Sequence, residues 1–317
     1  MNAGESRFSE AGSPGLDFKE ACMKRFITNA LVVGLVCGGA MVALTSRPST
    51  IAADDAVIQA DHALVEALEK GDRAAANKLL DADFTWIDPE GILWAKDDAF
   101  RAGLKPLVGS GGDVQTVEHK YGKVVWIQIS QGKNYSAHFW VERPAGWRLL
   151  HMTEIAVRQR DFRPVEPTYD IPCMNPCKEV PYKPISDGEK ASLDEWQEQE
   201  SSQAGWEKHV ADNLDQRVVS TFGGPSPSKA DRIAGMNKRK QANPNAPHVG
   251  AAPALWIRTW DFGEAVVMVS CQPTYGDKAY WSSRVLAPVN GVWQMTESYH
   301  NYILASPVMT AVPGGKS

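Results

Sequence analysis

The sequence lacks most of the patterns that mark the common catalytic and nucleic-acid-binding classes. It contains no GxGxxG, Walker loop, GxSxG or HExxH, so nucleotide cofactors and nucleophilic or zinc-assisted hydrolysis gain no support. Its seven histidines stand apart, without metal-ligand spacing, and we predict neither a metal nor a cofactor. A net charge of −5 and a pI near 5.8 offer no basic surface for DNA or RNA.

Cysteine is scarce as well, with five in 317 residues. Cys22 and Cys37 fall in the N-terminal stretch, and Cys271 lies in an apolar strand, where a buried thiol is expected. Cys173 and Cys177 stand close together among prolines, and we predict a small local disulfide if the compartment is oxidising. A zinc site is the alternative, but these two cysteines have neither a neighbouring histidine nor a second cysteine pair.

One long apolar run occurs, near the N-terminus. Lys24 and Arg25 precede an apolar stretch from Phe26 to about Leu44, the layout of a secretion signal. We predict that Met23 is the true start, that residues 1–52 form a leader, and that cleavage near Ala52 releases a periplasmic protein. The run approaches the roughly 20 residues that span a bilayer. An anchor in the inner membrane is therefore the alternative, and this segment is the only predicted contact with a membrane.

The stretch from Asp83 to Gly103 carries the best-formed local pattern. Phe84, Trp86 and Asp88 alternate with other residues, as in a half-buried strand. Asp88-Pro89-Glu90-Gly91 matches a type I turn, in which Asp accepts a backbone N–H and Pro fixes φ. A short strand over 92–94 and a short helix over 96–103 are expected to follow.

The order of the expected elements indicates two α+β domains. A helix over 54–70 and a second short helix precede strands over 117–129, 134–141 and 147–157. We place the first domain at 53–158, a proline-rich linker at 159–188, a second domain at 189–305 and a tail at 306–317. GVWQMTESYHNYI near the C-terminus mirrors GWRLLHMTEIAV at the end of the first domain, which suggests a tandem repeat.

The FTWIDPEGILWAK hairpin and the closing strand GWRLLHMTE resemble the SnoaL-like and ketosteroid-isomerase-like branch of the nuclear transport factor 2-like superfamily. The resemblance implies two cones, each a curved antiparallel sheet wrapped by N-terminal helices around a pocket. Its members include isomerases, cyclases and dehydratases, and also domains that only bind or dimerise. Because members pair through the open face of the sheet, the two copies could form a pseudo-dimer within one chain.

The first copy holds the candidate catalytic groups. By resemblance, a carboxylate would move a proton, and Asp88 is the closest candidate, with help from His138 or Tyr135. The alternative for Asp88 is a plain turn residue. His138 shares one strand face with Trp140, which would line either a pocket or a solvated surface. The second copy has no carboxylate from 218 to 228, which puts the same mechanism in doubt there.

The remaining candidates would contact a ligand. Trp256 and Trp260 share one face with Arg258 and could stack a flat molecule, although such tryptophans also pack sheets against helices. The full set of ligand-binding candidates is Trp86, Tyr135, Trp140, His151, Trp256, Arg258, Trp260 and Tyr299.

Two functions remain open. The one we favour is an exported tandem protein that binds a small apolar or aromatic molecule, or pairs, without turnover. The alternative is an isomerase, cyclase or dehydratase that acts on an apolar enolisable substrate with Asp88 as general base.

Overall fold

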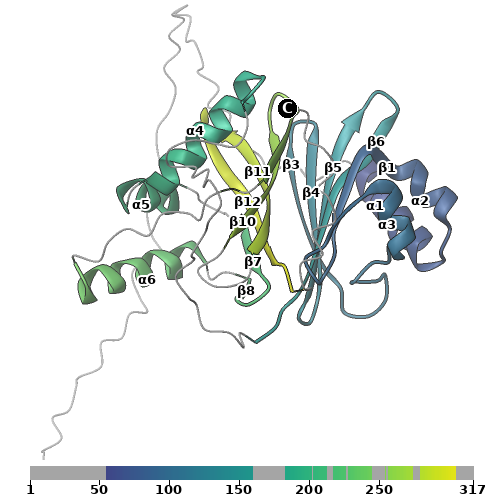
Figure 1. Cartoon of the computed structure of the whole chain (residues 1–317), viewed down its shortest axis with the longest axis horizontal. Coiled ribbons are helices and arrows are strands. Elements are labelled where there is room, and N and C mark those ends of the chain that lie inside the picture. Colours follow the sequence, from purple (N-terminus) through teal and green to yellow (C-terminus); the bar gives the residue numbers. More distant parts are fainter. Residues whose placement is uncertain are drawn as a thin grey trace, which may run out of the picture. The chain divides into compact units, whose positions relative to one another are not determined.

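The computed structural model describes residues 55–159, 183–201, 203–212, 217–225, 228–244, 254, 256–273 and 279–304. Within them lie two successive sets of helices and strands, from Asp55 to Ala156 and from Asp187 to Tyr302 (Figure 1). The predicted leader, the tail, most of the linker and the Cys173–Cys177 pair lie outside the described residues. No described helix is both long enough and apolar enough to cross a membrane.

The first half contains three helices and six strands. They are α1 (Asp55–Glu69), α2 (Arg73–Leu79), β1 (Leu80–Ile87), β2 (Leu93–Ala95), α3 (Lys96–Ala102), β3 (Gln115–Tyr121), β4 (Val124–Gln131), β5 (Asn134–Arg143) and β6 (Gly146–Ala156). The strands lie side by side in the order β2-β1-β6-β5-β4-β3. The helices cover one side of this sheet (Figure 1).

Two details of the first sheet differ from the expectation. The strand expected over 117–129 is two strands, β3 and β4, because Gly122 adopts a φ of 57° and closes a tight turn between them. The sheet is mixed rather than wholly antiparallel, because β1 runs parallel to β6. The connection between β1 and β6 passes through the rest of the half, as a parallel pair requires.

The second half repeats this arrangement. Its elements are α4 (Asp187–Ser201), α5 (Gln203–Asp212), β7 (Arg217–Ser220), β8 (Gly224–Pro225), α6 (Lys229–Ala242), β9 (Trp256–Asp261), β10 (Val266–Pro273), β11 (Ala279–Val289) and β12 (Val292–Tyr302). The strand order β8-β7-β12-β11-β10-β9 matches that of the first sheet, and β7 is parallel to β12 as β1 is to β6. The predicted α+β class and tandem arrangement are confirmed.

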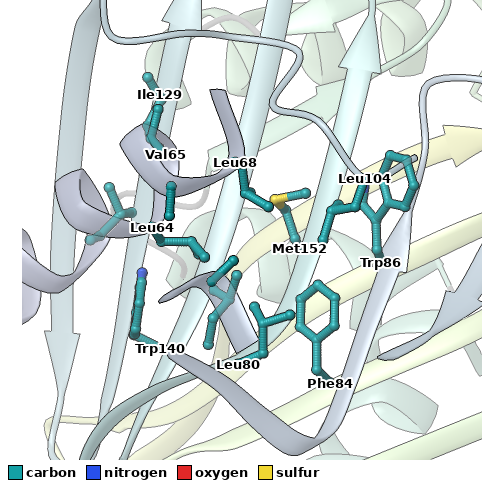
Figure 2. Close-up of a cluster of buried hydrophobic side chains, with 14 of the residues drawn as sticks. Leu64, Val65, Leu68, Leu80, Phe84, Trp86, Leu104, Ile129, Trp140 and Met152 are labelled. Atoms are coloured by element: carbon teal, nitrogen blue, oxygen red, sulfur yellow. The ribbon is translucent and has the colours of Figure 1, made fainter. Parts of the chain in front are cut away.

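We call the side of each sheet that packs on helices its helix face. In the first half the helix face packs on α1, because Leu64 and Leu68 repeat at helical spacing and point to the sheet (Figure 2). They meet Trp140 and Met152 from the strands and Trp86 from β1. In the second half a smaller cluster forms the helix face, with Leu193 and Trp196 from α4 against Met268, Leu286 and Met295 from the sheet.

We call the opposite side of each sheet its pairing face, because these two sides form one apolar cluster together. The first half contributes Ile87, Val124, Trp126, Ala137, Phe139, Val141, Leu150 and Ile155; the second contributes Val219, Trp260, Ala265, Val267, Val269, Cys271, Trp281, Val285, Ala287 and Tyr299. Cys271 is the buried thiol that the sequence predicted, and burial raises its pKa to about 12. The strands therefore bury side chains on both faces.

Candidate functional site

A buried polar chain crosses the helix face of the first half. Asp61 of α1 lies 2.6 Å, through Oδ1, from Nδ1 of His138 on β5, and the same oxygen accepts the indole N–H of Trp140 at 2.7 Å. Nε2 of His138 lies 2.9 Å from the hydroxyl of Ser136. All four residues are buried. Each polar atom named here has a hydrogen-bond partner within the protein.

The Asp61 carboxylate sets the charge of this chain. Burial disfavours the charged form of His138. The electrostatic attraction and hydrogen bond of Asp61 more than offset burial and raise the pKa of His138 above its ordinary value. A histidine and an aspartate that share a buried hydrogen bond form an ion pair when the ring is protonated. The arrangement orients the ring, and Trp140 holds the carboxylate in place.

Glu154 of β6 is the second titratable group on this face. Its Oε2 accepts the indole N–H of Trp86 at 2.9 Å, and Oε1 accepts the backbone N–H of Leu107 at 2.6 Å. Burial raises the pKa of Glu154 to about 7, partly offset by these two donors and by His138. A carboxyl group with a pKa near neutrality can give or take a proton at physiological pH.

Asp88 uses its carboxylate within its own turn. Oδ1 accepts the backbone N–H groups of Glu90 and Ile92, each at 2.9 Å, and Oδ2 accepts the indole N–H of Trp94 at 2.8 Å. These are the contacts of a turn residue. The catalytic role of Asp88 stays a prediction, as does that of His138.

Two of the predicted ligand contacts, Trp86 and Trp140, lie on the helix face with His138. The others lie on or at the edge of the pairing face. His151 of β6 bridges the halves there, with Nδ1 2.8 Å from the Thr85 hydroxyl and Nε2 2.8 Å from the Ser283 hydroxyl. Burial lowers the pKa of His151 to about 3, so the ring is neutral at physiological pH.

Tyr299 donates its hydroxyl proton to Gln128 of the first half at 2.5 Å. Tyr135 and Trp256 pack on the pairing-face cluster that includes Trp260. Arg258 stands over the Trp260 ring, 4.5 Å from its centre, and donates to Asp83 of the first half at 2.8 Å. The structure thus brings most of the predicted ligand contacts of the second half to the side of the sheet that meets the first half. Their roles in ligand binding stay predictions.

A buried carboxylate also crosses between the halves. Oε1 of Glu297 on β12 lies 2.6 Å from Nδ1 of His119 and accepts the Tyr121 hydroxyl at 2.9 Å. Its Oε2 has no hydrogen-bond partner in the described part of the chain. Burial raises the pKa of Glu297, opposed by His119 and Tyr121. Glu297 and its partners therefore place ionisable groups inside the face that joins the halves.

The β1–β2 turn contacts the second half as well. The carbonyl of Gly91 accepts the indole N–H of Trp281 at 2.9 Å. Gly91 has a φ of 77°, and a Cβ there would lie 2.4 Å from the Tyr302 carbonyl oxygen. The glycine therefore serves both the turn and a close approach of two backbones.

Sequence reasoning missed Glu154, Asp61 and Glu297. A signal was present for Glu154, because it ends the apolar run of GWRLLHMTE on the face that also holds Met152. Asp61 sits among the apolar positions of α1, a placement that indicates a buried acid with a partner. The partners of all three come from distant segments, which local patterns do not reveal.

Neither a family model nor a curated protein matches the sequence. Among solved structures, an NTF2-like protein from Cytophaga hutchinsonii shares 14% identity over 32% of this chain and 97% of its own, with a TM-score of 0.28. An NTF2-like protein of unknown function in nutrient uptake from Rhodospirillum rubrum shares 22% over 32% of this chain and 98% of its own, with a TM-score of 0.27.

A ketosteroid isomerase-like protein from Erwinia carotovora atroseptica is also similar, with 12% identity over 32% of this chain and 92% of its own and a TM-score of 0.25. The structures found are thus NTF2-like and ketosteroid isomerase-like proteins, the class that the hairpin and closing strand resemble. The tandem assignment itself rests on the identical strand order of the two sheets.

Proposed function

We propose that the chain is a tandem binding protein of the SnoaL-like class that performs no turnover and whose second half is the permanent partner of its first. One observation carries the proposal: the pairing faces of both sheets contribute to a single apolar cluster. Hydrogen bonds from His151 to Ser283 and from Tyr299 to Gln128 run through the same face. The pairing is an intrachain pseudo-dimer.

Two unpaired sheets would be less stable than the paired arrangement. Without a partner, each sheet would expose a contiguous set of large apolar side chains, among them Trp126, Phe139 and Trp281. Exposed apolar patches of this kind lead to association or aggregation. The second half therefore stabilises the first whether or not it has a site of its own.

Two neighbouring valines of β10 test the pairing. Val267 belongs to the pairing-face cluster, whereas Val266 is equally buried and points to the other side of the strand. Val267→Ala should reduce amide hydrogen-exchange protection in β4 and β5 of the first half, and Val266→Ala should leave it unchanged. Equal effects of the two substitutions on the first half would argue against pairing.

The ligand that we propose is a small apolar or aromatic molecule. Native mass spectrometry of the full chain purified from its own host should show a bound mass that is lost on denaturation. A spectrum with only the bare chain, recorded under conditions that preserve a known non-covalent complex, would contradict ligand binding and leave pairing as the function.

We also propose, from the pattern of residues 23–52, that the protein is exported to the periplasm. The intact mass of protein from a periplasmic extract should correspond to a chain that begins near residue 53. Recovery of the uncleaved chain in the membrane fraction would favour an anchor instead.

A second candidate function, proton transfer on an enolisable substrate, is favoured by Glu154. Its pKa of about 7 and its buried position suit a general acid or base. Turnover of an enolisable ketosteroid by the parent, Glu154→Gln and Asp88→Asn separates the possibilities. Loss of turnover in Glu154→Gln alone assigns the base to Glu154, and loss in Asp88→Asn alone assigns it to Asp88. No turnover by the parent supports a protein that binds or pairs.

A further inference from the structure

A glycine-rich segment lies over the helix face of the first half. Residues 103–114, all of which the structure describes, connect α3 to β3 without regular secondary structure. Two of their apolar side chains, Leu104 and Val108, are buried in the helix-face cluster, where Leu104 joins Trp86 (Figure 2). Lys105 of the same segment is exposed. The segment therefore has one side in the core and the other in solvent.

The carboxyl group of Glu154 lies beneath this segment. The backbone N–H of Leu107 donates to its Oε1 at 2.6 Å, and the indole N–H of Trp86 donates to its Oε2 at 2.9 Å. Glu154 is 1% exposed, so its carboxyl group has almost no contact with solvent. One of these two donors belongs to the segment. Movement of the segment would remove that donor and let water take its place.

The far end of the segment is fastened to α1 by a contact that lies in solvent. Oε1 of Glu69 accepts the backbone N–H of Ser110, and Oε2 accepts the Ser110 hydroxyl, each at 2.8 Å. The backbone passes so close here that a Cβ at Gly109 would lie 2.4 Å from Oε1 of Glu69. Water competes for exposed hydrogen bonds, so each stabilises the closed arrangement only modestly. This contact can therefore open locally while the sheet stays folded.

Glycines near both ends of the segment allow such a movement. Gly103, at the end of α3, has a φ of 82°, and Gly112 has a φ of 84°. Glycine adopts positive and negative φ about equally well, so these positions can change conformation at low cost. Hinges are typically a few residues of this kind at the ends of loops or elements. The segment thus combines two hinge positions with one exposed and one buried fastening.

We infer that residues 103–114 form a hinged lid, latched to α1 through Glu69 and Ser110, whose opening exposes Glu154 and Trp86 to solvent and to small molecules. The inference goes beyond the proposed function, because the opening is defined without a ligand. The closed lid keeps Glu154 out of contact with any molecule outside the protein. Control of the latch is therefore control of access to this carboxyl group.

Two variants of α1 test the latch. Glu69→Ala removes the acceptor of Ser110, whereas Glu66→Ala removes the same charge one turn earlier, from an exposed pair with Lys70. In the full chain without ligand, amide hydrogen exchange of Leu107 should accelerate roughly fivefold in Glu69→Ala and stay unchanged in Glu66→Ala. Mass spectrometry of short peptides that cover Leu107 measures the exchange.

Trp86 reports on the space beneath the lid. Its indole N–H donates to the same carboxyl group as the Leu107 amide. In ¹⁵N-tryptophan-labelled protein its signal is assigned by its loss in Trp86→Phe, and its exchange with water should also accelerate in Glu69→Ala. Amides of β5 should exchange at the parental rate, because the sheet stays folded when the lid opens.

A second pair of variants changes the lid itself. Gly109→Ala places a methyl group against Oε1 of Glu69, whereas a Cβ at Gly111 would meet no atom within 4 Å. Neither glycine has a positive φ, so the backbone cost of the two substitutions is similar. Gly109→Ala should accelerate exchange of Leu107, and Gly111→Ala should not. If Glu69→Ala does not fold, this pair makes the same comparison.

Three results would overturn the inference. Equal exchange of Leu107 in Glu69→Ala and Glu66→Ala would show that the contact with α1 does not hold the segment closed. Acceleration of the same size throughout β5 would show general destabilisation instead of a local opening. Faster exchange of Leu107 with unchanged exchange of the Trp86 indole would show that the segment moves without uncovering the carboxyl group.

Discussion

At the scale of single residues, the buried carboxylates differ in the groups that donate hydrogen bonds to them. Asp61 is paired with an imidazole and an indole, whereas Glu154 is held by one indole N–H and one backbone N–H. The first has a partner that can carry positive charge next to it, and the second has none in direct contact. This difference decides how each residue contributes to stability.

Removal of Asp61 should destabilise the protein strongly. Asp61→Ala leaves His138 and the Trp140 N–H without their acceptor in a buried site, and we expect the free energy of unfolding to fall by about 3–5 kcal/mol. Urea unfolding measures it. Asp55→Ala, at the exposed start of the same helix, is the control and should cost less than about 1 kcal/mol. Similar losses in both would mean that the buried pair has no special role.

Glu154 should make stability depend on pH. Its ordinary pKa of 4.5 rises to about 7 in the folded protein. Between these values the unfolded chain ionises first, so the parent loses stability as pH rises from about 4.5 to about 7, by about 3 kcal/mol. Glu154→Gln cannot ionise and lacks this loss.

The comparison is between unfolding free energies of the parent and Glu154→Gln at pH 4.5 and pH 7.5. The difference between the two proteins should move in favour of the variant by about 3 kcal/mol at the higher pH. Parallel pH profiles would show that Glu154 titrates alike in the folded and unfolded chain.

At the scale of elements, the β1–β2 turn links local geometry to the contact between halves. Asp88 closes the turn with its carboxylate, and its backbone carbonyl accepts from Asn301 of β12 at 2.9 Å. The carbonyl of Glu90 accepts the backbone N–H of Leu304 at 2.9 Å. One tight turn therefore provides acceptors to the end of the last strand.

Gly91→Ala should test this link. Both Gly91 and Gly132 have positive φ, but a Cβ at Gly132 would meet no atom within 4 Å, whereas one at Gly91 would collide with the Tyr302 backbone. We expect Gly132→Ala to cost about 1 kcal/mol from backbone strain alone. Gly91→Ala should cost on the order of 3 kcal/mol more. Thermal unfolding of the two variants measures this difference. Equal unfolding midpoints would contradict a close approach at Gly91.

Much of the element order could be predicted because it depends on local patterns. The spacing of Leu64 and Leu68 and the Asp88–Gly91 turn are readable from neighbours in the chain. The β3–β4 turn was missed because a single glycine, Gly122, makes it. The sequence also did not predict that Trp256 and Trp260 face the other sheet rather than the helices. Alternation shows which residues share a strand face, but it does not show what that face contacts.

At the scale of the whole described chain, three apolar clusters replace one continuous core. Each helix face has its own cluster, and the third joins the two sheets. The largest aromatic side chains are divided among them, with Trp140 in the first, Trp126 in the joining cluster and Trp196 in the second half. Because both pairing faces are covered, neither sheet needs a second copy of the chain.

The full-length protein should therefore be a monomer. Light scattering after size exclusion should give the mass of one chain at all concentrations from about 1 to about 100 μM. Val267→Asp, which places a charge in the pairing face, should shift the protein towards larger species or lower solubility. The parent eluting as a concentration-dependent dimer would mean that the two halves leave an associating surface exposed.

His151 and Glu297 hold the same place in their respective sheets, each on the strand that runs parallel to the first strand of its half. In an assembly of two identical polypeptides, one gene would set both positions, so an imidazole could not face one side while a carboxylate faced the other. Covalent fusion of a duplicated sequence removes that restriction. Each copy can then change independently, which is why the two pairing faces can carry different residues at matching positions.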